Sequence, residues 1–145
     1  MPRRLPPSRV LKKLCRARDL IRDCYGEPLT LPELSEEAGL SAWHFLRLFK
    51  AAFGETPHQF HTRLRIEKAK ELLTVTGRSV TDVCLDVGYS SLGSFSTLFA
   101  RHVGESPHAF RRRVRAWVRV PGRHPWALVP YCFALAFGEP PTGNP

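Results

Sequence analysis

GLSAWHFLRLFKAAFGETPHQF, residues 39–60, is followed later in the chain by nearly the same pattern, GYSSLGSFSTLFARHVGESPHAF, residues 88–110. From Ser41 onward the two copies match at an offset of fifty positions, and before Ser41 the offset is forty-nine. The matched residues of the two copies include Ser41 and Ser91, Phe45 and Phe95, Leu48 and Leu98, Phe49 and Phe99, Gly54 and Gly104, and Pro57 and Pro107. The chain therefore contains an internal repeat.

Each copy carries signals for one helix followed at once by another. Ser41 can accept a hydrogen bond from a free amide at the helix start, and phenylalanine and leucine at i, i+3 and i+4 give one apolar face. Gly54 can take the left-handed conformation that ends a helix. Thr56 and Pro57 then provide the N-cap and first position of the next helix.

A further short helix is expected just before each copy. Thr30-Leu-Pro-Glu33 and Ser79-Val-Thr-Asp82 both resemble a capping box. Gly39 and Gly88 follow these helices and are expected to break them. A capped helix, a glycine-centred turn and a second helix form a helix-turn-helix, so the sequence predicts two such units.

The helix expected after Ser41 has an unusual outward face. At about 100° per residue, the face opposite the phenylalanines holds Trp43, Leu46, Arg47 and Lys50. Cations suit phosphate oxygens or guanine edges, and apolar groups suit thymine methyls, so this face fits a major groove. The alternative is that Trp43 and Leu46 pack on a neighbouring helix while the cations are solvated.

The arrangement resembles the DNA-binding domain of the AraC/XylS family of bacterial transcription regulators over roughly residues 10–117. The resemblance is carried by LSEEAGLSAWHFLRLFKAAFGETPHQF, RLRIEKAKELL and SVTDVCLDVGYSSLGSFSTLFARHVGESPHAFRR. It implies an all-α fold of two tandem helix-turn-helix subdomains, homeodomain-like units, bridged by a long shared helix. It also implies a sequence-specific transcription regulator that places two recognition helices in successive major grooves of double-stranded DNA.

The expected organisation has five parts. Residues 1–7 form a disordered N-terminus, 8–56 and 75–118 form the two helix-turn-helix subdomains, 57–74 form the linking helix, and 119–145 form a tail rich in proline and aromatic residues. The first helix is expected to run from a cap at Ser8 to Tyr25. In the linking helix, Phe60 and Leu64 share one side whereas Ile66 lies with three other apolar residues on nearly the other, so it needs two partners.

The candidate DNA contacts come from both copies. Base reading is assigned to Trp43, His44, Leu46, Arg47, Lys50, Gly93, Ser94, Ser96 and Thr97. Phosphate contact is assigned to Ser41, Ser91, Arg101, His102, Arg111, Arg112 and Arg113. Thr97 replaces the arginine usual in the family, so the resemblance implies that the second helix reads bases weakly.

Charge and composition agree with a nucleic-acid partner. The 145 residues contain 22 Lys and Arg against 13 Asp and Glu, a formal charge of +9. Such a balance attracts polyanions, although a generic basic protein is the alternative. The cations of the first helix either contact phosphates or are merely solvated: Arg9, Lys12, Lys13, Arg16, Arg18 and Arg22. The four cysteines show no metal or disulfide spacing, which favours reduced thiols.

Partners and compartment follow from the same patterns. The opening MPRRLPPSR is unlike a signal peptide, so a cytoplasmic protein with no membrane partner is expected. Two units in one chain predict DNA binding as a monomer. No effector-binding domain precedes Val10, so ligand control within the chain is not expected. The apolar run from Trp126 to Phe137 folds back, forms an oligomer interface or contacts a partner such as RNA polymerase.

Two other function classes fit the sequence less well. In the main rival, the chain is a protein-interaction module that acts through its tail, with secondary DNA contacts. An enzyme is disfavoured because the sequence shows no nucleophile triad, paired carboxylates or phosphate-binding loop, so neither a cofactor nor a catalytic residue is expected. His58 and His61 at i, i+3 could share a metal, but helix-start packing explains them better, and no metal site is expected.

Overall fold

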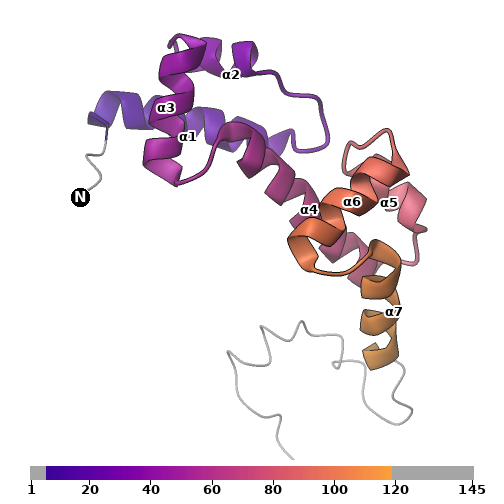
Figure 1. Cartoon of the computed structure of the whole chain (residues 1–145). Helices are drawn as coiled ribbons and strands as arrows, with labels where there is room; N and C mark the ends of the chain where they lie inside the picture. The colour runs from indigo at the N-terminus through magenta and orange to yellow at the C-terminus, as the bar shows by residue number, and fades with distance from the viewer. Residues whose placement is uncertain (1–5, 119–145) are drawn as a thin grey trace, which may run out of the picture.

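The computed structural model describes residues 6–118, in which every regular element is a helix. The helices are α1 (Ser8–Asp23), α2 (Leu31–Glu37), α3 (Ala42–Phe53), α4 (Pro57–Val75), α5 (Val80–Asp86), α6 (Leu92–Val103) and α7 (Pro107–Val118). Figure 1 shows α1–α3 gathered at one end of α4 and α5–α7 at the other. This arrangement confirms the expected fold, two tandem helix-turn-helix units joined by a long shared helix.

The first unit packs its apolar faces around the start of α4. Its core consists of Leu14, Ala17, Ile21, Leu34, Ala38, Phe45, Phe49 and Phe60. The Phe49 ring meets Phe60 of α4 edge-on, with ring centroids 6.0 Å apart. Such aromatic pairs add to the stabilisation from apolar burial, and here they hold α3 against α4.

The second unit repeats this core with the later part of α4. Its buried residues are Ile66, Ala69, Leu73, Val80, Val83, Cys84, Val87, Phe95, Phe99 and Phe110. Phe99 and Phe110 stand in the same relation as Phe49 and Phe60, with ring centroids 5.6 Å apart. The two apolar sides of α4 therefore belong to two cores, as the sequence predicts.

The predicted helix boundaries are formed by the expected groups. Thr30 with Glu33, and Ser79 with Asp82, make complete capping boxes at the starts of α2 and α5. Thr56 and Gln59 make a further box at the start of α4. Gly54 and Gly104 end α3 and α6 in the left-handed conformation, which glycine adopts without steric cost.

The ends of α1 differ from expectation. Pro7, rather than Ser8, stands at the N-cap, and its carbonyl accepts hydrogen bonds from the amides of Val10 and Leu11 at 2.9 Å each. The predicted cap at Ser8 is therefore wrong, because Ser8 already lies inside the helix. The helix also ends at Asp23 rather than Tyr25, because Tyr25 leaves it to pack against the second core.

Several expectations concern residues outside the described range. The tail at 119–145, with its apolar run, and the first five residues of the proposed disordered N-terminus lie there. Pro6 is described and buried. The linking helix continues one residue beyond its predicted end, to Val75. Among the helices of residues 6–118, none combines the length and apolar character needed to cross a bilayer.

Candidate nucleic-acid interface

The outward face of α3 is exposed along its length. Trp43 is 65% exposed, and His44, Arg47 and Lys50 are also exposed, whereas Leu46 is half-buried. The Arg47 guanidinium stacks over the Trp43 ring, 4.5 Å from its centroid. Of the two interpretations of Trp43, packing against a neighbouring helix is therefore wrong. The Trp43 ring and the cations beside it therefore lie at the surface, where a partner can contact them together.

Ser41 fixes the start of this helix. Its hydroxyl accepts a hydrogen bond from the His44 amide at 3.4 Å, and the same bond joins Ser91 to the Ser94 amide in the second unit. Both serines are exposed. Each N-cap therefore presents a hydroxyl and free backbone amides at the helix end, groups that commonly contact DNA phosphates.

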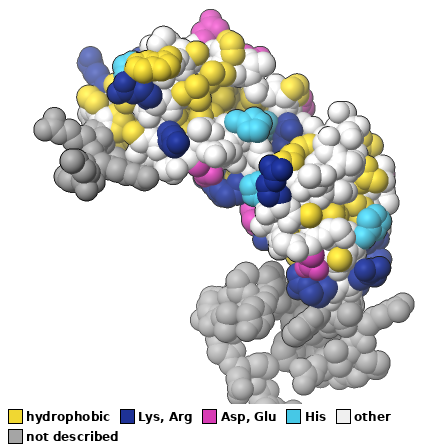
Figure 2. All heavy atoms as spheres, in the orientation of Figure 1, with side chains coloured by type: hydrophobic (Ala, Val, Ile, Leu, Met, Phe, Trp, Pro, Cys, Tyr) yellow, Lys and Arg dark blue, Asp and Glu magenta, His cyan; other side chains and the backbone are white. Residues whose placement is uncertain are grey.

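The matching face of α6 is small and uncharged. Gly93, Ser94 and Thr97 are exposed and Ser96 is half-buried. The Thr97 hydroxyl donates a hydrogen bond to the Gly93 carbonyl at 3.0 Å, so its donor is already used within the helix. Figure 2 shows the contrast, since charged and apolar side chains gather over α3 while the surface over α6 is mostly uncharged.

The arginines of α7 differ in their surroundings. Arg113 pairs with Glu105, with Nη2 2.6 Å from the carboxylate, and stacks over Phe110. Arg111 donates to the Gly77 carbonyl at 3.3 Å. Arg112 is exposed and makes no hydrogen bond or ion pair with the described residues. Of the three predicted phosphate contacts, Arg112 is therefore the most available to DNA.

The Arg113 pair is a structural element of the repeat. Fifty positions earlier, Arg63 pairs with Glu55 at 2.6 Å and stacks over Phe60. Each pair connects the turn after a recognition helix to the next helix. Exposed pairs of this kind contribute little to stability, but each occupies the guanidinium of one arginine in its unit with a carboxylate of the same unit.

Arg101 and His102 of α6 are both exposed in the last turn of the helix. The helix dipole favours the positive charge of Arg101 at this end even without DNA. Their position is compatible with phosphate contact, which stays a prediction.

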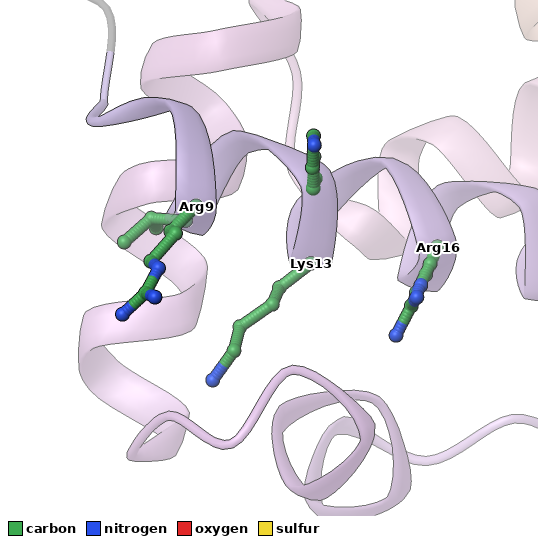
Figure 3. A pocket seen from close by; sticks show the side chains of 5 residues that line it. Arg9, Lys13 and Arg16 are labelled. Carbon is green, nitrogen blue, oxygen red and sulfur yellow. The ribbon is translucent and has the colours of Figure 1, made fainter.

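A basic hollow lies along α1. It is lined by Arg9, Val10, Lys12, Lys13 and Arg16. Figure 3 shows Arg9, Lys13 and Arg16 extending from the same side of the helix. Lys13 reaches the turn between α2 and α3, where its Nζ lies 3.0 Å from the position that a Cβ on Gly39 would take. Arg18 does not join this set, because it pairs with Asp19 and stacks over Phe53.

The carboxylates of the two capping boxes keep their charge readily. Hydrogen bonds from the backbone and hydroxyl of Thr30 lower the pKa of Glu33. Hydrogen bonds from the hydroxyl and backbone of Ser79 likewise lower the pKa of Asp82. A negative group at the start of a helix complements the helix dipole, so these carboxylates stabilise the starts of α2 and α5.

His58 and His61, the two histidines in the first turns of α4, have structural rather than metal-binding surroundings. His61 Nε2 lies 2.8 Å from the Tyr25 carbonyl oxygen, while His58 is exposed at the start of α4. Within residues 6–118, no group of three or more His, Cys, Asp or Glu side chains is placed to hold a metal ion.

Comparison with known proteins places these features in one family. A family of helix-turn-helix domains matches residues 34–113. Over 87 residues, the chain is 42% identical to the MmsAB operon regulatory protein of Pseudomonas aeruginosa, a match that covers 60% of this chain and 28% of that protein. The chain spans about a third or less of the length of the curated relatives it matches.

Two solved structures share the fold. A transcriptional regulator with an AraC-type DNA-binding domain from Chromobacterium violaceum is 29% identical, with a TM-score of 0.67, and the match covers 77% of this chain and 96% of that one. The DNA-binding domain of AdpA, a global transcriptional factor solved in complex with a target DNA, is 28% identical, with a TM-score of 0.70. That match covers 76% of this chain and 98% of the AdpA domain. With its two repeated units and shared α4, the chain belongs to the AraC/XylS family of helix-turn-helix regulators.

Proposed function

We propose that this chain is a sequence-specific DNA-binding transcription regulator that inserts α3 and α6 into successive major grooves. The observation that carries the proposal is the exposed face of α3, where Trp43 and Arg47 form a stacked pair beside Lys50. An apolar ring and cations on one helix face suit base edges and phosphates together. The formal charge of +9 supports a polyanionic partner.

The two recognition helices divide the work unequally in this proposal. The first helix supplies most base discrimination through Trp43, His44, Leu46, Arg47 and Lys50. The second helix carries Gly93, Ser94, Ser96 and Thr97, and it positions the protein through hydroxyls, backbone amides, the Arg101 guanidinium and the His102 imidazole. Specificity is therefore expected to be stronger in the half of the site that faces α3.

The binding mode is that of a monomer on an asymmetric site. In Figure 1, α3 passes in front of α1 and α6 passes in front of α4, which supports an approach to DNA from one side. Two contacts on one face of the duplex lie one helical turn, about 34–36 Å, apart. The chain acts by binding rather than by catalysis, on DNA of the bacterial cytoplasm, and any contact with RNA polymerase is secondary to this.

Selection of bound fragments from random genomic DNA tests the proposal. The expected outcome is one enriched asymmetric motif with two recognised segments about one turn apart. Titrations of the motif and of a scrambled duplex at two salt concentrations then separate base reading from charge attraction. Equal affinity for both duplexes at each salt concentration, or a palindrome that needs two chains, would contradict the proposal.

A further inference from the structure

The segment after α1 contacts the second unit, although it belongs to the first in sequence. Tyr25 packs against the second core, which the later part of α4 forms together with α5, α6 and α7. A Cβ on Gly26 would lie 3.3 Å from the Asp86 carbonyl oxygen, at the end of α5. Residues 25–27 therefore reach from the end of α1 to the helix-turn-helix of the other unit.

Arg65 of α4 holds this segment in place. Its Nε donates to the Tyr25 carbonyl at 2.7 Å, and its Nη2 donates to the Glu27 carbonyl at 3.0 Å. The same guanidinium lies over the ring of Tyr89, 5.2 Å from its centroid. One half-buried arginine thus joins the connecting segment of the first unit to the turn of the second.

Gly88 completes the contact from the side of the second unit. Its φ is +85°, and a Cβ there would lie 2.3 Å from the Gly26 carbonyl oxygen and 2.9 Å from Arg65 Nη2. The oxygen belongs to the backbone, so it cannot rotate away as a flexible side chain would. The corresponding glycine of the first unit, Gly39, faces only the flexible end of Lys13.

We propose that Arg65, Gly88 and residues 25–27 form a clasp that fixes the two helix-turn-helix units relative to one another and so selects the spacing between the two halves of the DNA site. The inference rests on the proposed DNA-binding function. Arg65 is a positioning residue in this view, because it binds the protein backbone rather than DNA.

The physical reason lies in the separate cores of the two units. Each unit buries its own apolar cluster, and α4 passes between them. A single helix can bend or twist, whereas a second contact beside it removes this freedom. Two linked binding modules gain affinity only when both can reach their sites at the same time. If the two helix-turn-helix units are fixed relative to one another, they therefore favour one spacing between the two halves of the DNA site.

The first experiment compares Arg65→Met with a matched control, Arg63→Met, in the full chain. Arg63 lies on the same helix but pairs with Glu55 inside the first unit. Both variants and the wild type are titrated against three duplexes: the selected site, the site with one base pair inserted between its halves, and the half facing α3 alone. Each inserted base pair rotates one half by about a tenth of a turn.

We expect the wild type to bind the selected spacing about tenfold more tightly than the altered spacing. Arg65→Met should lose most of this preference while keeping wild-type affinity for the single half-site, and Arg63→Met should keep the preference. A wild type that binds both spacings equally would overturn the clasp but not the proposed function. A wild type that prefers none of these duplexes to scrambled DNA would overturn the proposed function itself.

The second experiment needs no DNA. Residual dipolar couplings of the two units should fit one common orientation in the wild type and in Arg63→Met, but two independent orientations in Arg65→Met. Gly104→Ala and Gly88→Ala form a further matched pair, because both glycines have left-handed φ values and Gly104 has no atom within 4 Å of its Cβ position. Gly88→Ala should separate the units and Gly104→Ala should not. If Gly88→Ala does not fold, the test rests on Arg65→Met. Dipolar couplings of the two units that fit one common orientation in that variant would refute the clasp.

Discussion

The Arg47 guanidinium lies over the ring of Trp43, 4.5 Å from its centroid, so the two side chains form one stacked pair on the outer face of α3. The matching positions of α6 are Thr97 and Gly93, where the Thr97 hydroxyl is bonded to the Gly93 carbonyl instead. The repeat therefore reproduces the scaffold of the first unit but not its exposed aromatic and charged pair.

This difference predicts unequal effects on DNA recognition. Arg47→Ala should weaken the free energy of binding to the selected site by about 1–3 kcal/mol and relax specificity at one base pair. The reason is that Arg47 can donate two hydrogen bonds to a guanine edge. Thr97→Ala should cost much less. Titrations of both variants against specific and scrambled duplexes measure the difference. If Thr97→Ala loses as much affinity as Arg47→Ala or more, α6 rather than α3 makes the main base contacts.

Trp43→Ala should separate DNA affinity from folding stability. Because Trp43 is 65% exposed, its removal should change the free energy of unfolding by no more than about 0.5 kcal/mol. Affinity for the selected site should fall, since in the proposed binding mode the ring provides the apolar contact and orients Arg47. Urea unfolding and DNA titration of the same preparation give both values. A large loss of stability with unchanged affinity would show that the ring serves the fold.

Arg112 and Arg113 should respond differently to removal. Arg112→Ala should weaken binding to all sequences alike and reduce the slope of log affinity against log salt by about one unit, as expected for a lost phosphate contact. Arg113→Ala should change the slope less, because its guanidinium is already paired with Glu105. Salt titrations of the two variants on one duplex make the comparison, and identical slopes for both variants would contradict it.

The basic hollow of α1 should contribute a phosphate contact beside the first unit. Lys13 lies next to the turn that precedes α3, whose start approaches DNA in a helix-turn-helix. Lys13→Gln should therefore reduce the salt slope by about one unit. Arg18→Gln is the control, since Arg18 pairs with Asp19. If Lys13→Gln leaves the slope of log affinity against log salt unchanged, Lys13 does not contact a DNA phosphate and is merely solvated.

His61 should make stability depend on pH. Burial, together with the positive charges of Arg65 and His58, lowers the pKa of His61, although its hydrogen bond to the Tyr25 carbonyl acts in the opposite direction. A lowered pKa in the folded state means that the stabilisation is present above about pH 6.5 and is lost as the pH falls.

Urea midpoints of the wild type at pH 7.5 and pH 5 should therefore differ more than those of His61→Gln. His58→Gln, at an exposed histidine of the same helix, should keep the wild-type difference. A His61→Gln variant with the full wild-type pH dependence would trace the effect to other groups.

Most of the fold could be predicted from the sequence because its determinants are local. Capping boxes such as Thr30 with Glu33, the left-handed Gly54 and the faces of α3 each depend on residues within a few positions of one another. The repeat then shows each signal twice. The exposed face that carries Arg47 follows from helical periodicity alone, so the candidate DNA-reading residues of α3 could be named before any tertiary contact was known.

Tertiary structure decided which of those residues are available and how the two units are joined. Arg113 pairs with Glu105 while its neighbour Arg112 is exposed, and Tyr25 leaves α1 for the second core. Arg65 binds carbonyls 38 and 40 positions earlier in the chain. Sequence periodicity does not predict these contacts, because they form between segments that are distant in the sequence and meet only in the folded chain.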